Sequence, residues 1–126
     1  MIAGHGIDLC EVARMGEALS RNGEHFARRV FTEGERAYAE SAANRLERYA
    51  ARFAAKEAAM KALGTGWTAG VTWHDFEVQN EPGGKPVLLL HGEAASIAES
   101  RGITRIHLSL THTAANAMAS VILEAE

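Results

Sequence analysis

The sequence contains a single cysteine, Cys10, and lacks any long apolar run. One cysteine excludes an internal disulfide and fits a reducing compartment, so we expect Cys10 to be a packing residue. No apolar run approaches the ~20 residues that a membrane span requires. The first residues also lack the basic region and apolar core of a secretory signal. We therefore expect a cytoplasmic protein that does not engage a membrane.

The sequence also lacks the signatures of several common binding sites. A net charge of −3 gives no reason to expect a nucleic-acid partner. The six histidines include no H-E-x-x-H pair, which argues against zinc. The G-x-x-x-x-G-K-[ST] phosphate loop is absent as well. Gly64 and Gly66 follow a predicted helix instead of preceding one, so they are expected to cap it.

The composition is that of one globular domain. The chain has 126 residues, of which 47% are hydrophobic and 23% charged, with no repeat or linker. We therefore expect a single domain over residues 1–126.

Hydrophobic periodicity predicts separate groups of helices and strands. Helices are expected over 10–21, in short pieces over 24–40, over 42–63 and over 93–102; strands over 1–9, as a hairpin around 82–84, and over 105–112 and 117–125. Thr32 followed by Glu35 is a candidate capping box. Segregated elements indicate the α+β class, with a mainly antiparallel sheet packed against one long helix and shorter helices.

The long helix carries a carboxylate where an apolar residue would be expected. At about 100° per residue, Phe53 and Met60 fall on one apolar stripe, and Glu57 lies between them. Lys61 is four residues further on, so a surface ion pair with Glu57 is one interpretation. A carboxylate on a core-facing line is costly unless it is paired or bound to a metal. A functional role for Glu57 is the second interpretation.

Asp8 is the second unusual carboxylate. In a strand its side chain shares a face with Gly4 and Gly6, which leave room for a ligand or for a close backbone. The competing interpretation is an aspartate that caps the following helix. Two carboxylates without a Cys/His set suit Mg²⁺, and a lysine such as Lys61 would supply charge to phosphate oxygens. Asp8, Glu57 and Lys61 together would form a metal–diphosphate site.

Two further features have both ordinary and functional interpretations. Arg14 and Arg21 lie seven residues apart on one helical face, as on a solvated surface or on one that meets an acidic protein. His112 ends an alternating strand pattern, where a core or loop histidine is the commoner outcome.

Three blocks of the sequence resemble one known family. Gly4-His5-Gly6-Ile7-Asp8 fits its G-x-G-x-D segment, the stretch from Phe53 to Gly66 fits F-A-A-K-E-A-x-x-K-A-L-G-T-G, and Ser109 to Thr113 fits S-[IL]-[ST]-H-[ST]. These blocks are similar to those of the holo-acyl-carrier-protein synthases, the small bacterial type of 4′-phosphopantetheinyl transferase. The likeness extends over essentially the whole chain.

The resemblance implies an activity and a set of partners. A member of this family transfers 4′-phosphopantetheine from coenzyme A to a serine of apo-acyl carrier protein, releasing 3′,5′-ADP in support of fatty acid biosynthesis. It would have the phosphopantetheinyl transferase fold and form a homotrimer with active sites between subunits.

The resemblance also implies roles for particular residues. Asp8 and Glu57 would bind Mg²⁺, and Lys61 would assist departure of 3′,5′-ADP. Glu57 or a water at the metal would deprotonate the serine, and the sequence does not separate the two. Contacts to coenzyme A would come from Lys61, Gly64, Gly66, Ser109, His112, Arg45 and Arg52. Arg14 and Arg21 would meet the acidic carrier protein.

Two alternatives belong to other classes of protein. A non-catalytic module could bind coenzyme A or a nucleotide with the same residues, although loss of Glu57 or Lys61 would be expected there. A thioesterase of the hotdog type also handles pantetheine thioesters in a small α+β oligomer. It needs no Asp–Glu–Lys metal site, so metal dependence distinguishes it from a transferase.

Overall fold

A computed structural model describes the whole chain, from Met1 to Glu126, as four α-helices, one short 3₁₀-helix and five strands. The elements in chain order are β1 (Ile2–Glu11), α1 (Val12–Val30), α2 (Glu33–Glu40), α3 (Arg45–Leu63), η1 (Trp73–Asp75), β2 (Phe76–Asn80), β3 (Pro86–Leu90), α4 (Gly92–Ser100), β4 (Ile103–His112) and β5 (Asn116–Ala125). No helix combines the length and apolar character that crossing a bilayer requires.

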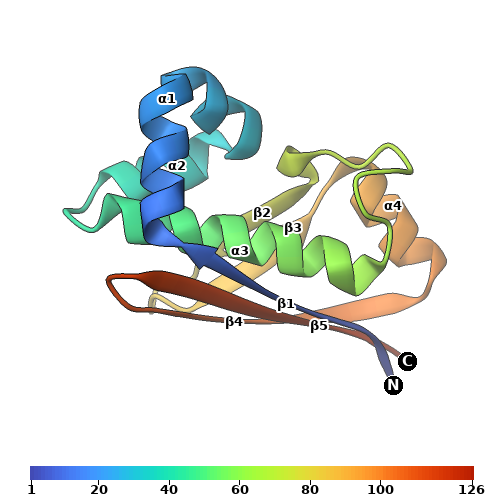
Figure 1. The fold of residues 1–126 in the computed structure, drawn as a ribbon. Coiled ribbons are helices and arrows are strands. Elements are labelled where there is room, and N and C mark those ends of the chain that lie inside the picture. Colours follow the sequence, from blue (N-terminus) through green and yellow to red (C-terminus); the bar gives the residue numbers. More distant parts are fainter.

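All strand pairings are antiparallel, as the sequence predicts, but the strands form two sheets instead of one. The larger sheet has the order β1-β5-β4, and the smaller is the β2-β3 hairpin. Figure 1 shows α3 running along the larger sheet, with α1 and α2 gathered near one end of it and α4 near the other. The predicted α+β class and the long helix against the sheet are confirmed.

Local sequence signals explain where the helices begin and end. The predicted break near Gly23 is a kink inside α1, where this residue has φ 54° and ψ −137°. The predicted capping box at α2 is formed, since Thr32 and Glu35 each accept a hydrogen bond from the other's backbone amide. Helix α3 ends at Gly64, which is left-handed (φ 73°) and donates its amide to the Met60 and Lys61 carbonyls.

Helix α3 is buried on most of its circumference, and not on one stripe alone. Of the predicted stripe, Met60 is buried and Phe53 half-buried, and Tyr49 and Leu63 beside it are buried as well. Seven alanines are also buried: Ala50, Ala51, Ala54, Ala55, Ala58, Ala59 and Ala62. The sheet covers one side of the helix, while α1, α2 and β2 cover others. A helix with cover on several sides has no wide polar face, which explains its alanine content.

Two glycines of β1 allow α3 to lie directly on the sheet. A Cβ at Gly4 would stand 2.2 Å from the Ala62 carbonyl oxygen, and one at Gly6 would stand 1.9 Å from that of Ala58. Both distances are far inside van der Waals contact. Of the two interpretations of these glycines, close backbone approach is therefore the one that the structure supports.

We predict that Gly6→Ala destabilises the fold by about 1–3 kcal/mol or more, because the added methyl forces the α3 backbone away from β1. Gly83→Ala is the matched control, since a Cβ there meets nothing within 4 Å. Urea unfolding of both variants checks the prediction. Equal midpoints for Gly6→Ala and the wild type would contradict it.

Candidate active site

Strand β1 and helix α3 bring Asp8 and Lys61 into direct contact. Lys61 Nζ lies 2.9 Å from Asp8 Oδ1 and also donates to the Ile7 carbonyl at 3.1 Å. The Lys61 side chain is 52% exposed and that of Asp8 only 19%. Asp8 lies inside β1 and caps no helix, because Glu11 precedes the first residue of α1. The Lys61 ammonium therefore lies on the solvent side of the site, and the Asp8 carboxylate is the more deeply buried of the two groups.

Glu57 lies one helical turn before Lys61 and is half-buried. Burial raises the pKa of its carboxyl above the ordinary 4.5, and the nearby negative charge of Asp8 raises it further, whereas Lys61 lowers it. The surface ion pair between Glu57 and Lys61 is not formed, because Lys61 is engaged by Asp8. Glu57 is therefore a carboxylate without a salt-bridge partner, close enough to Asp8 to be repelled by it.

The contact with Asp8 also shifts the pKa of Lys61. Its hydrogen bond to Asp8 raises the pKa of the ammonium above the ordinary 10.5. Lys61 is accordingly protonated at neutral pH and brings a full positive charge to the site.

A pocket of about 540 Å³ opens beside this cluster, between β1, α1 and α3. Its lining includes Cys10, Arg14, Met15, Phe26 and Phe53. Burial, and after it the charge of Asp8, raises the pKa of the Cys10 thiol to about 11. A thiol with that pKa stays protonated at neutral pH, so Cys10 is a packing residue, as the sequence predicts.

The structure does not bring His112 to this cluster within one chain. His112 Nδ1 lies 2.8 Å from Glu47 Oε1, at the other end of α3. Glu47 and Glu57 are ten residues apart, or about 15 Å along a helix. Ser109 is exposed on β4. Gly64 and Gly66, in contrast, lie three and five residues after Lys61, and both have positive φ.

The two candidate arginines differ in their access to a ligand. Arg45 is 42% exposed and makes a bidentate ion pair with Glu40, at 2.8 and 3.0 Å. Arg52 is only 3% exposed, with its guanidinium 4.0 Å from the Tyr38 ring centroid and 2.5 Å from Asn80 Oδ1. Of the two, only Arg45 reaches solvent in this chain.

Arg14 and Arg21 lie on α1, the helix that follows β1. Arg14 is 79% exposed and only 3.8 Å from Glu11, a weak surface contact. Arg21 is exposed in a shallow hollow that it shares with Glu17 and Ser20. Both guanidinium groups are free to meet a partner molecule.

A fully buried ion pair that no sequence pattern predicted lies directly beside Glu57. Lys56 Nζ lies 2.7 Å from Glu35 Oε1, and neither side chain has any exposed surface. The same ammonium donates to the carbonyls of Trp73, at 3.1 Å, and Phe76, at 2.5 Å. All three protons of the lysine thus have an acceptor, which a buried charge requires.

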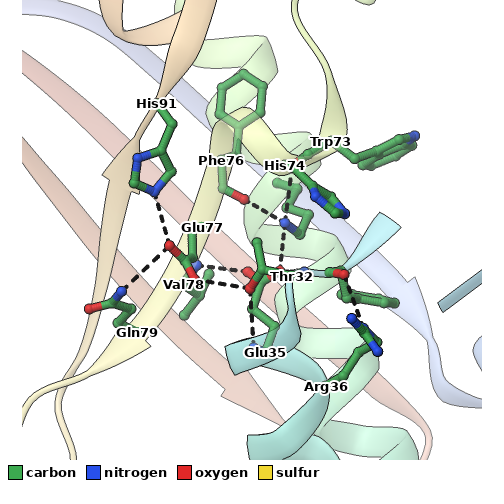
Figure 2. Close-up of polar contacts among 12 residues, drawn as sticks. Thr32, Glu35, Arg36, Trp73, His74, Phe76, Glu77, Val78, Gln79 and His91 are labelled. Atoms are coloured by element: carbon green, nitrogen blue, oxygen red, sulfur yellow. Dashed lines mark hydrogen bonds and ion pairs between the residues drawn. The ribbon is translucent and has the colours of Figure 1, made fainter. Parts of the chain in front are cut away.

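The carboxylate of this pair is equally well satisfied. Besides Lys56, Glu35 accepts the backbone amides of Thr32, at 2.9 Å, and Val78, at 2.8 Å. Figure 2 shows how these contacts continue through Thr32 to Glu77 and from there to His91 near the surface. A polar network therefore joins α2 and β2 to α3.

The sequence contained a signal for Lys56 that the apolar stripe obscured. At 100° per residue, Lys56 lies on the same side of the helix as Tyr49 and Leu63, which are both almost fully buried. Glu57 lies on the opposite side of the line through Phe53 and Met60. Lys56 is thus the more deeply placed of the two charged residues. Its partner Glu35 could not be identified from periodicity, because its burial depends on the packing of α2 against α3.

The two carboxylates of the site fit a hard divalent cation better than a softer one. Nowhere in the chain do three side chains of the Asp, Glu, His or Cys types gather closely enough to hold a metal by themselves. Asp8 and Glu57 offer only oxygen donors. The pKa of Glu57 is raised first by burial and then by the negative charge of Asp8, and a cation between the two carboxylates would relieve that repulsion. Mg²⁺ commonly takes one or two protein carboxylates and completes its shell with water and phosphate oxygens.

Comparison with known proteins identifies the family. The model of the 4'-phosphopantetheinyl transferase superfamily matches residues 4–117. A holo-[acyl-carrier-protein] synthase from Solibacter usitatus (strain Ellin6076) is 60% identical over 124 residues, covering 98% of this chain and 99% of the relative. This chain belongs to the holo-acyl-carrier-protein synthase family.

Solved structures of family members have the same fold. The synthase from Neisseria meningitidis superposes with a TM-score of 0.90 at 31% identity, covering 98% of this chain and 99% of that one. The synthase from Bacillus anthracis, solved in complex with CoA (3',5'-ADP), gives 0.81 at 38% identity over 100% and 99% of the two chains. The phosphopantetheinyl transferase fold expected from the sequence is thereby confirmed, and a hotdog thioesterase fold is excluded.

We predict that Glu57→Gln raises the melting temperature in metal-free buffer at about pH 7.5. A carboxyl whose folded pKa is raised destabilises the fold when ionised, and this cost disappears below its ordinary pKa of 4.5. The gain should therefore vanish near pH 4. Calorimetry at both pH values with EDTA measures it.

Glu17→Gln is the control, because this glutamate is exposed on α1 and makes no salt bridge. It should leave the melting temperature unchanged at both pH values. A lower melting temperature for Glu57→Gln at pH 7.5 would show that the carboxylate of Glu57 stabilises the fold, and would contradict the prediction.

Proposed function

We propose that residues 1–126 form one catalytic domain that transfers 4′-phosphopantetheine from coenzyme A to a serine of apo-acyl carrier protein. The observation that carries this proposal is the meeting of Asp8, Glu57 and Lys61 in a chain 60% identical to a holo-[acyl-carrier-protein] synthase. The serine oxygen forms a bond to the phosphorus that bears pantetheine. The bond from that phosphorus to the bridging diphosphate oxygen breaks, and 3′,5′-ADP leaves.

In this proposal Asp8 and Glu57 bind Mg²⁺. When bound, Mg²⁺ supplies Lewis-acid neutralisation of the diphosphate charge. Among the residues of this chain, Glu57 is the half-buried carboxylate next to Asp8 that would accept the serine proton.

Lys61 neutralises the charge that develops on the leaving group. Its ammonium is half-exposed and bound to a single carboxylate, so it can turn from Asp8 towards a diphosphate oxygen when substrate binds. Gly64 and Gly66 leave the backbone after α3 without side chains, which allows a phosphate group to approach.

The carrier protein docks beside this cluster. Arg14 and Arg21 present exposed positive charge on α1, as recognition of an acidic partner requires. The adjoining pocket, lined by Met15, Phe26 and Phe53, supplies apolar contact at the same surface. A carrier protein held there would bring its serine to the Asp8 end of β1.

We also propose that the protein is a homotrimer whose active sites lie between subunits, acting in the cytoplasm. Ile7, Leu9 and Met118 are exposed by 52%, 55% and 38% on neighbouring strands of the larger sheet. A self-associating face would bury these apolar side chains. A neighbouring subunit would also bring its own His112, Ser109 and Arg45 towards Asp8 and Glu57, where coenzyme A contacts both chains.

The first experiment is the intact mass of apo-acyl carrier protein after incubation with this protein, coenzyme A and Mg²⁺, beside an EDTA control. We expect a gain of roughly 340 Da, one phosphopantetheine, only when metal is present. Glu57→Gln should reduce the rate at least about 100-fold, the scale on which one charge-stabilising group contributes to catalysis. Full activity of that variant, or transfer in EDTA, would overturn the assignment of the site.

A second experiment tests whether the site is shared between chains. Glu57→Gln and His112→Ala are each expected to be inactive. When the two variants are refolded together at 1:1, about a quarter of wild-type activity should return, because about one site in four combines an intact Glu57 from one chain with an intact His112 from its neighbour. Size-exclusion chromatography with light scattering reports the trimer. A mixture as inactive as its components would show that both residues act within one chain.

A further inference from the structure

The contact between α3 and β1 does little to specify how the helix is oriented on the sheet. The α3 residues that meet β1 there, Ala58 and Ala62, are alanines, and they face Gly4 and Gly6. Interdigitated side chains normally fix how a helix lies on its neighbour. Alanine against glycine gives close approach but only shallow ridges. The direction and rotation of α3 therefore depend on its contacts with β5 and with the elements on its other sides, which include α2 and β2.

Lys56 supplies contacts of the required kind. Its ammonium is held by acceptors from three segments: Glu35 on α2, the Trp73 carbonyl on η1 and the Phe76 carbonyl at the start of β2. Hydrogen bonds are directional, and the Lys56 ammonium is fully buried, so water cannot replace an acceptor that it loses. A small rotation or slide of α3 would break several of them together.

Glu57 follows Lys56 directly, so the position of one fixes the position of the other. One residue of slippage in a helix is about 1.5 Å of translation, and one residue of rotation is about 100°. Asp8, in contrast, lies on β1, which is held by its pairing with β5. The separation of the two site carboxylates therefore depends on the setting of α3.

A second contact acts in the same place. Phe53, one turn before Glu57, stacks on Trp73 with ring centroids 5.1 Å apart. The Trp73 carbonyl is also one of the Lys56 acceptors. The segment from Trp73 to Phe76 thus holds α3 both through the ring of Phe53 and through the ammonium of Lys56.

We propose that the buried Lys56–Glu35 ion pair sets α3 on the sheet so that Glu57 and Lys61 face Asp8. Lys56 and Glu35 are then positioning residues for phosphopantetheine transfer and touch neither substrate nor metal. This inference rests on the proposed function of the site.

Stability and positioning can be separated, because replacing both members of a buried ion pair by neutral residues is often neutral or stabilising. Removing one member alone leaves an unpaired buried charge and is expected to unfold the protein. The test variant is therefore the double substitution Glu35→Gln/Lys56→Met, which removes both charges and keeps an amide oxygen for the Val78 N–H.

We expect the folded double variant to lose at least tenfold in kcat and to need at least threefold more Mg²⁺ for half-maximal activity. The KM for carrier protein should stay at the wild-type value, because its docking surface on α1 is untouched. Circular dichroism and thermal unfolding establish that the variant is folded. Glu24→Gln/Arg28→Met is the matched control, since it removes an exposed ion pair of similar length, 2.9 Å, and should leave kcat and the Mg²⁺ requirement unchanged.

A folded double variant with wild-type kcat and Mg²⁺ requirement would overturn the proposal. Should the double variant not fold, Glu35→Asp retains both charges and draws the carboxylate back by one methylene. We expect it to raise the Mg²⁺ requirement at least twofold. Glu35→Asp with lower stability but wild-type kinetics would assign the pair a structural role alone. Failure of the wild type itself to transfer phosphopantetheine would instead refute the proposed function.

Discussion

The close contact between the α3 backbone and β1 is the constraint on which the rest of the molecule depends. Gly4 and Gly6 let the helix carbonyls approach to a distance that no side chain would allow. At this separation a lysine on α3 contacts an aspartate on β1, as Lys61 contacts Asp8. A wider helix–sheet spacing would keep the same fold but separate the two halves of the site.

Much of the fold follows from local signals in the sequence. Capping by Thr32 and Glu35, the break at Gly23 and the end of α3 at Gly64 each depend on residues within one turn of the chain, which periodicity and turn chemistry can identify. The division into two sheets could not be predicted in this way. Strand pairing depends on which edges meet in three dimensions, and alternation within a strand does not encode its neighbour.

The site shows the same division between local and long-range information. Glu57 and Asp8 stood out because each is a carboxylate in an otherwise apolar or small-residue pattern, and the structure brings both near Lys61. Lys56 was missed, because a lysine between an alanine and a glutamate looks like ordinary helix surface. Its burial results from contacts with Glu35 on α2 and with Phe76 at the start of β2, which lie 21 and 20 residues away in the sequence.

The hydrogen bond from the Val78 amide to Glu35 has a practical consequence. That amide points to a carboxylate, so its proton resonance depends on the charge and position of Glu35. In a nitrogen–proton spectrum it would serve as a built-in probe of the interior network, readable without substrate or metal. Microsecond-to-millisecond motions of α3 relative to the sheet would broaden the Val78 amide resonance by exchange, even where the overall stability of the protein does not change.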